Sequence, residues 1–134
     1  MADTVTSQTI QDGERVAILK FTNESDGTGE ASVKKVDVSA LSKDSRGRSC
    51  SSVSISRIYW ACRGMGVDIE FDASTNVLAI PLPADSTGDE YYDLFSGIPN
   101  NAGSGVTGDI DFTTVAHSNG DAYSIILVLN KNYS

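Results

Sequence analysis

Histidine, cysteine and long apolar runs are all scarce in this sequence of 134 residues. The chain holds one histidine and two cysteines, and its apolar runs reach only five or six residues. A helix that spans a bilayer needs about 20 apolar residues, so we expect no membrane segment. The first residues contain neither a basic nor an apolar stretch, so we expect no secretory signal and predict synthesis in the cytoplasm.

The two cysteines, Cys50 and Cys62, limit the possible chemistry. Their spacing fits no zinc motif. A disulfide across a hairpin remains open, although the cytoplasm favours reduced thiols.

Catalytic motifs are also missing. His117 is the single residue of the type that most often acts as a general base, with Ser118 and Asp121 close in sequence. A tight turn rarely gives these three side chains the geometry of a catalytic triad. The glycine-rich residues 97–108 contain no lysine and precede no expected helix, so they are not a phosphate-binding loop. We predict a solvated His117, no enzyme activity and no cofactor.

Charge is distributed unevenly along the chain, whose net charge is -8. Seven of the ten bases and two of the eighteen acids fall in residues 34–63, which gives this segment a net charge of +5. The acidic remainder argues against a nucleic-acid binder. The basic segment has two interpretations: bases that protect strand edges from aggregation, or a surface that docks on an acidic partner.

Short apolar segments recur about every ten residues between turn residues, and no amphipathic helical pattern of useful length is present. The hydrophobic share of 40% and the charged share of 21% are typical of a globular domain. We therefore predict an all-β fold: one domain over residues 1–134, an antiparallel β-sandwich or jelly-roll-like barrel of about eight or nine short strands. The expected strands cover residues 4–11, 15–23, 31–38, 53–62, 67–72, 76–82, 90–95, 110–114 and 122–130.

Local signals refine this picture. Asp12 and Gly13 predict a hairpin between the first two strands. The apolar residues before and after position 56 differ in parity, so keeping them all inward requires a β-bulge near residues 56–57. The prolines at positions 81 and 83 place their strand at a sheet edge. Residues 39–41 fit either the end of a strand or one helical turn.

Two sets of carboxylates alternate with apolar residues along their strands. Asp68, Glu70 and Asp72 form one set, and Asp109 and Asp111 form the other. Alternation predicts solvated sheet faces. Such carboxylates also suit Ca²⁺ or a glycosidase acid pair, but no spacing is diagnostic and we assign no metal.

Four stretches resemble small proteins encoded by tailed bacteriophages, many from aquatic environments: residues 13–23 (GERVAILKFTN), 37–41 (DVSAL), 58–61 (IYWA) and 100–115 (NNAGSGVTGDIDFTTV). The resemblance runs over most of the chain, and its motifs are structural rather than catalytic. It implies a non-enzymatic virion structural protein, namely a capsid decoration (cement) protein bound in many copies to the outside of the head. Small phage β-proteins also serve as tail or head–tail connector components, and that alternative stays open.

On this resemblance, the expected partner is the major capsid protein or another virion protein. The expected location is the capsid exterior, after synthesis in the host cytoplasm. We expect a homo-oligomer, with a trimer favoured because it would set acidic faces against basic ones, and neither nucleic acid nor membrane as a partner. Residues 4–11 offer an edge strand to a partner. The candidate interface residues are Lys34, Lys35, Lys43, Arg46, Arg48, Tyr91 and Tyr92.

Two of these candidates cannot share one patch, because adjacent strand residues such as Lys34 and Lys35 point to opposite faces. The loop that carries Lys43, Arg46 and Arg48 is therefore the sharper docking candidate. The tyrosines also support a third hypothesis, a carbohydrate-binding module, because tyrosine offers a flat area with a polar tip. That hypothesis requires at least two of Trp60, Tyr91 and Tyr92 to be exposed and coplanar, whereas the default is one tyrosine packed and the other exposed.

Overall fold

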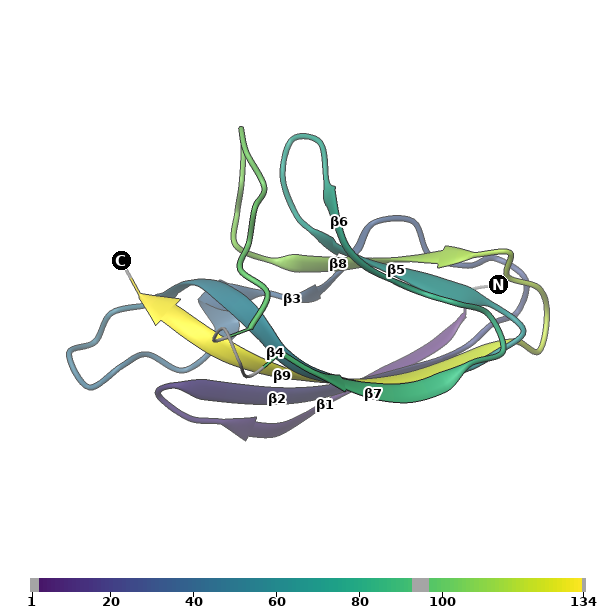
Figure 1. Ribbon diagram of the computed structural model, residues 1–134, viewed down its shortest axis with the longest axis horizontal. Coiled ribbons are helices and arrows are strands. Elements are labelled where there is room, and N and C mark those ends of the chain that lie inside the picture. Colours follow the sequence, from purple (N-terminus) through teal and green to yellow (C-terminus); the bar gives the residue numbers. More distant parts are fainter. Residues whose placement is uncertain (1–2, 93–96, 134) are drawn as a thin grey trace.

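The computed structural model describes residues 3–92 and 97–133, which form two antiparallel sheets packed face to face (Figure 1). The larger sheet has the order β1-β2-β9-β4-β7, and the smaller sheet has the order β3-β8-β5-β6. This architecture of nine strands over the described residues confirms the predicted all-β sandwich. The strands are β1 (Thr4–Asp12), β2 (Val16–Glu24), β3 (Val33–Val36), β4 (Cys50–Arg63), β5 (Gly66–Phe71), β6 (Val77–Leu82), β7 (Thr87–Tyr91), β8 (Ile110–Val115) and β9 (Ala122–Tyr133).

A single apolar core lies between the sheets. Strands β2 and β9 each bury every second side chain, as the period of two along a strand requires. Phe112 of β8 meets Phe21 of β2 edge-on, with ring centroids 5.4 Å apart, and lies 5.9 Å from the ring of Tyr123 of β9. These rings join the two sheets, and burial of each phenylalanine contributes about 1.5–3 kcal/mol.

The bulge predicted in the fourth strand is present. The pairing of β4 with β9 shifts register between Ile55 and Arg57. The extra residue, Ser56, reverses the parity of the strand, so that Ile55 and Ile58 are both fully buried. The Ser56 hydroxyl is satisfied by donating to the Val128 carbonyl at 3.2 Å.

The structure also shows how the other predicted segments fold. Residues 39–41 belong to a helical turn rather than a strand end, because the 3-10 helix η1 covers Val38–Ala40. Strand β7 begins three residues before the expected residues 90–95 and overlaps them at Glu90 and Tyr91, while residues 93–95 lie outside the described residues. Strand β6 is an edge strand as its prolines predicted, and β9 is central in its sheet.

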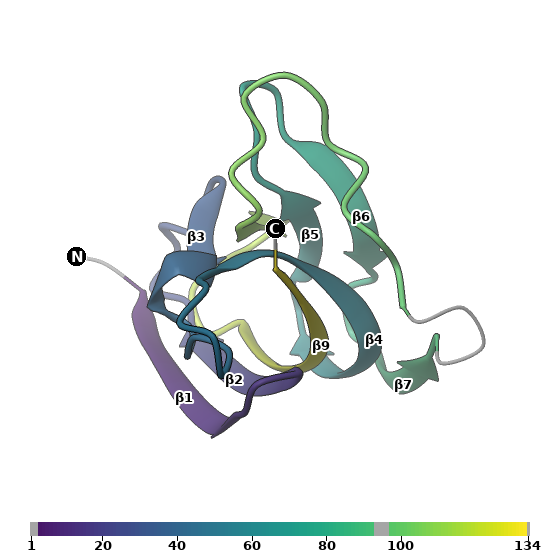
Figure 2. The same ribbon diagram turned by 90° about the vertical axis from the view of Figure 1, so that its left-hand side faces the viewer.

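A projecting lobe stands above the smaller sheet, formed by the β5–β6 turn and residues 100–108 side by side (Figures 1 and 2). Ser74 donates its backbone N–H to the Ser104 carbonyl at 3.2 Å, and Thr107 donates to the Asp72 carbonyl at 3.3 Å. Gly108, with φ +89°, ends the lobe at a place where any Cβ would overlap the Ser51 backbone. Only glycine fits such a position.

Both cysteine thiols are free and buried, which settles the question of the disulfide. Burial raises the pKa of the Cys50 and Cys62 thiols. Within residues 3–92 and 97–133, no helix has the length and apolar character needed to cross a bilayer.

Candidate functional site

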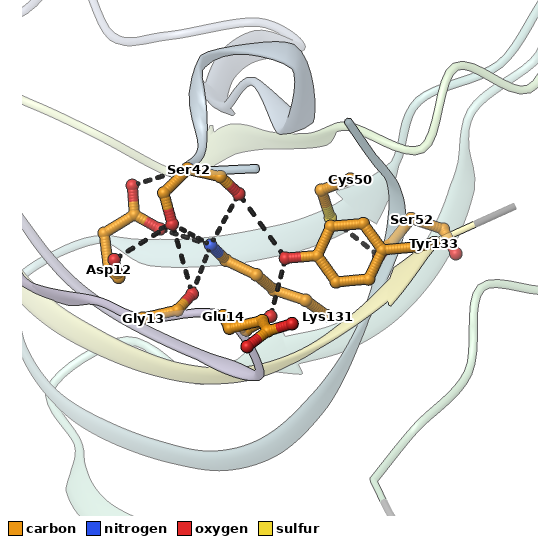
Figure 3. A network of polar contacts seen from close by, with 8 residues as sticks. All are labelled: Asp12, Gly13, Glu14, Ser42, Cys50, Ser52, Lys131 and Tyr133. Atoms are coloured by element: carbon orange, nitrogen blue, oxygen red, sulfur yellow. Dashed lines mark hydrogen bonds and ion pairs between the residues drawn. The ribbon is translucent and has the colours of Figure 1, made fainter. Parts of the chain in front are cut away.

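A buried ammonium group organises one end of the sandwich. The side chain of Lys131, near the end of β9, is fully buried. Its Nζ donates to the Gly13 carbonyl at 2.6 Å, the Ser42 carbonyl at 3.2 Å and the Ser42 hydroxyl at 2.9 Å, and it forms an ion pair with Asp12 (Figure 3). This network links the β1–β2 hairpin, the segment after η1 and the central strand of the larger sheet.

The same network contains a serine hydroxyl beside a lysine, an arrangement that some hydrolases use. A catalytic Ser-Lys pair needs a neutral lysine that accepts the serine proton. Here every polar neighbour of the Lys131 Nζ is an oxygen acceptor, and Asp12 supplies a negative charge. Burial alone would raise the pKa of Asp12, but hydrogen bonds from Lys131 and Ser42 outweigh it and hold that pKa below its usual value. The pair is therefore a structural link.

A pocket of about 520 Å³ opens beside this network. Tyr133 forms one wall: its hydroxyl donates to the Glu14 carbonyl at 2.6 Å, and the Arg48 guanidinium lies 5.8 Å from its ring centroid. The Arg48 side chain is half exposed, and its Nε is 2.7 Å from Asp44. The residues that line the pocket are Glu14, Arg15, Asp44, Arg48, Ser54, Asn130, Lys131, Asn132 and Tyr133.

The loop of residues 42–49 forms the rim of this pocket. Asp44 shapes the loop by accepting the backbone N–H groups of Arg46 at 3.0 Å and Arg48 at 2.8 Å. Ser45 donates its N–H to the Glu14 carboxylate at 3.0 Å, which holds the loop against the β1–β2 turn. Lys43 and Arg46 are exposed and form no ion pair within the described part of the chain.

We call this assembly the basic end: the β1–β2 turn, residues 42–49 and the end of β9. Its Lys131–Asp12 pair is neutral, and it otherwise carries four bases against Glu14 and Asp44, a net of +2 in a chain of net -8. The four bases are Arg15, Lys43, Arg46 and Arg48.

The remaining predicted docking charges lie elsewhere. Lys34 is half exposed, but its Nζ is 2.7 Å from Asp109. Lys35 is buried against Glu30 at 2.5 Å, with both side chains only 6% exposed. The two lysines do point to opposite faces, as expected. Because the Lys35 charge is enclosed in an ion pair, it cannot reach a partner, and the prediction that Lys35 docks is corrected on that ground.

The aromatic candidates do not form a common platform. Tyr91 is 54% exposed, whereas Tyr92 and Trp60 are half-buried and pack against the core. The default of one packed and one exposed tyrosine therefore holds. Sequence reasoning missed Tyr59, whose ring meets Tyr91 edge-on with centroids 6.2 Å apart. Arg57 lies 4.3 Å from the Tyr91 ring centroid and covers one face of it.

The two carboxylate sets come together on the outer face of the smaller sheet. Glu70 of β5 pairs directly with Asp111 of β8. Asp109 and Asp111 are only 4% and 3% exposed, so the prediction that they lie on a solvated face is wrong. Lys34 binds Asp109, and Asn76 of the lobe donates to Asp111 at 2.9 Å; these neighbours enclose the two carboxylates.

Asp111 has the most unusual protonation in this group. Burial, together with a hydrogen bond between its carboxyl group and that of Asp72, raises its pKa to about 6. Asp72 accepts a hydrogen bond from Thr107 at 2.7 Å, which holds the pKa of Asp72 below its usual value. Among residues 3–92 and 97–133, no group of three or more His, Cys, Asp or Glu side chains is arranged to hold a metal ion.

His117 belongs to no triad. Its Nδ1 lies 3.2 Å from the Thr114 hydroxyl, and its ring packs against Gly29. Asp121 accepts instead from the backbone N–H and hydroxyl of Ser118, at 2.8 and 3.1 Å, and so caps its own turn. His117 is half-buried rather than fully solvated.

Sequence reasoning missed Arg15, Lys131 and Tyr133 at the basic end. A signal existed for Lys131, because it continues the inward parity of Leu127 and Leu129. A lysine at an inward position of a central strand predicts a buried partner carboxylate.

The fold and this site together define an antiparallel β-sandwich with one basic end. No protein-family model and no curated protein matches the chain. Among solved structures, it is similar to peruvianin-I, a cysteine peptidase from Thevetia peruviana latex, at 12% identity and a TM-score of 0.40, over 97% of this chain and 64% of that one. The chain thus spans less than two thirds of the peptidase.

Two further solved structures have the same kind of likeness. A cupin superfamily protein from Desulfitobacterium hafniense DCB-2 shares 13% identity at a TM-score of 0.37, over 96% of this chain and 80% of that one. A family 29 carbohydrate binding module shares 12% identity at a TM-score of 0.40, over 96% of this chain and 89% of that one. At such identities the likeness concerns β-sheet architecture and assigns no activity.

Proposed function

We propose that this chain is a non-enzymatic structural protein of a tailed-phage virion, a decoration protein that binds the head exterior in many copies. The resemblance of its sequence to small phage proteins motivates the proposal. We infer the mode of binding from the basic end. There, Lys43 and Arg46 are exposed and form no ion pair within the described residues. The matching surface on a capsid subunit is acidic.

The opposite end of the sandwich is acidic, which supports docking through the basic end. Its loops are tied together by hydrogen bonds, including Ser25 N–H to the Asp121 carbonyl at 2.7 Å and Gly64 N–H to the Asp85 carboxylate at 2.7 Å. This end carries five acids and Arg63, a net of -4. An acidic shell would repel this end and attract the basic one, so the charge distribution orients the molecule on its partner. The five acids are Asp3, Glu24, Asp26, Asp85 and Asp121.

The candidate catalytic groups support a structural rather than an enzymatic role. His117 contacts Thr114, Asp121 caps a turn, and the Ser42 hydroxyl accepts a hydrogen bond from a charged lysine. Each of these side chains thus stabilises the fold.

Decoration clamps neighbouring capsid subunits against the pressure of packaged DNA. A contact of about 800 Å² per partner can be modest in affinity. Contact with two subunits at once raises the effective strength by a large factor without any new type of interaction. A small, rigid sandwich that docks through one end suits this task, because the docking charges sit on a loop held in place by Asp44 and Glu14.

The test is binding of the purified protein to particles that lack it. The double variant Lys43→Glu/Arg46→Glu should bind at least about tenfold more weakly, and added salt should weaken binding of the wild type. The control Lys20→Glu/Arg63→Glu changes the net charge equally but lies away from the basic end, and should bind as the wild type does. Equal loss of binding in both variants would show that net charge alone matters and would contradict docking through the basic end.

Two other functions remain candidates for the same fold. A tail or head–tail connector component would be present only in the small number of copies of one ring. A carbohydrate-binding module would respond on a glycan array, but its requirement for two exposed, coplanar aromatic rings is not met, since Tyr91 is the one exposed member of its predicted aromatic set.

A further inference from the structure

Over the described residues the two sheets have four edge strands, and three of these carry features that prevent pairing with another strand. Strand β3 carries Lys34 and Lys35, β6 contains Pro81, and β7 carries Asp89 and Glu90. Charged side chains, proline and short length are the usual devices that keep an edge from adding a further strand. These three edges are also short, at four to six residues.

Strand β1 lacks all of these devices. It is nine residues long, and its sequence TVTSQTIQD contains no lysine, arginine or proline and a single charge, Asp12, at its end. Residues 4–11 are exposed, and β2 is the one strand that pairs with β1 in the described sheet. Its pairing with β2 is regular from Thr4 to Thr9, before a register shift. Along this stretch, alternate residues present their backbone N–H and C=O groups to the open side.

The side chains of β1 also favour pairing of this edge with another strand. Val5 and Ile10 are 42% and 50% exposed, so two of the large exposed apolar side chains of the molecule lie on this one strand. Between them stand threonine, serine and glutamine side chains, which hydrogen-bond well across paired strands.

We propose that β1 pairs with β1 of a second copy of this chain, antiparallel and about a two-fold axis, to join two five-stranded sheets into one. A second copy fits this edge because residues 4–11 are uncharged, so two identical strands meet without opposing charges in the paired stretch. A two-fold axis needs no second complementary surface elsewhere on the molecule.

This arrangement has a geometric consequence. Because the two β1 strands run in opposite directions, and β1 ends at the basic end, the two basic ends of the dimer point away from each other. If the proposed docking through the basic end is correct, one dimer bridges two acidic sites. The pairing itself does not depend on that docking.

The experiment is the molar mass of the full chain by light scattering and sedimentation across a wide concentration range. We expect a concentration-dependent dimer rather than the trimer favoured from the sequence. Thr6→Lys should raise its dissociation constant by about tenfold or more, since paired copies would bring the new charges together. The matched control, Thr87→Lys, places the same change on the β7 edge of the same sheet and should leave the dimer intact.

Hydrogen exchange of the wild-type chain supplies a readout that needs no variant. Alternate β1 amides should gain protection as the dimer forms. A monomer at every concentration would overturn the proposal, as would a trimer, or a dimer that Thr6→Lys and Thr87→Lys affect equally. Failure of particle binding with an intact dimer would reject the docking function alone.

Discussion

Replacement of Asp111 by asparagine should stabilise the protein at neutral pH and remove part of its pH dependence. Asp111 is buried on β8, where it faces Lys34 of β3, Glu70 of β5 and the Asp72 carboxylate. One of its oxygens, Oδ2, accepts from Asn76 at 2.9 Å, while Oδ1 has no hydrogen-bond donor among the described residues. An asparagine keeps the acceptor and presents an N–H₂ group to Asp72, as the protonated acid does.

The size of the expected stabilisation follows from the pKa of Asp111, which rises from 3.8 to about 6. A difference of about two pKa units corresponds to at most ~3 kcal/mol. Screening by solvent near the lobe reduces this to about 1–2 kcal/mol. Since the folded-state pKa is the higher one, the stabilising contribution of the bound proton is fully present below pH 3.8 and is lost as the pH rises through about 6.

The assay is denaturant unfolding followed by the fluorescence of the single tryptophan, Trp60, at about pH 5 and about pH 7.5. Wild-type stability should fall between these values, and Asp111→Asn should fall less, with a gain of about 1–2 kcal/mol at the higher pH. Asp89→Asn, on the exposed β7 edge, makes the same change of charge and should show no such gain. If the free energy of unfolding changed with pH equally in the wild type and Asp111→Asn, the reasoning would be refuted.

Three other perturbations test the framework of the fold. Lys131→Met leaves the Asp12 carboxylate without its buried partner and should cost about 3 kcal/mol in the free energy of unfolding, measured by denaturant titration; a loss under about 1 kcal/mol would contradict a linking role. Cys50 and Cys62 should both resist a thiol reagent in the native protein and react together after unfolding, and rapid reaction of either without denaturant would contradict their burial. Gly108→Ala should lower the melting temperature, because its φ of +89° and its contact with β4 exclude a Cβ; an unchanged melting temperature would contradict that packing.

The fold was predictable from the sequence because its signals are local. The parity change around Ser56 required a bulge, and the bulge is there because inward-facing residues on both sides of it gain burial. The prolines placed β6 at an edge for an equally local reason, the missing backbone donor. Strand ends were less predictable: β4 begins at Cys50, in a serine-rich stretch that has no strand pattern of its own and pairs with the end of β9.

The candidate site was predictable only in part, because burial of charge depends on residues distant in sequence. The loop with Lys43 and Arg46 is exposed as expected. Tyr123, which is 93 residues from Glu30, helps to enclose the Lys35–Glu30 pair, and Asn76 of the lobe covers Asp111; no spacing or periodicity encodes these contacts. Alternation marks which side of a strand a residue faces, but not what covers that side.

The most direct measurement of the proposed function is the number of copies of this chain per purified virion, by quantitative mass spectrometry against the major capsid protein. A decoration protein should be present in copies on the order of hundreds, since it engages many equivalent subunits of the shell. A copy number as small as one ring, or absence from the particle, would contradict the account.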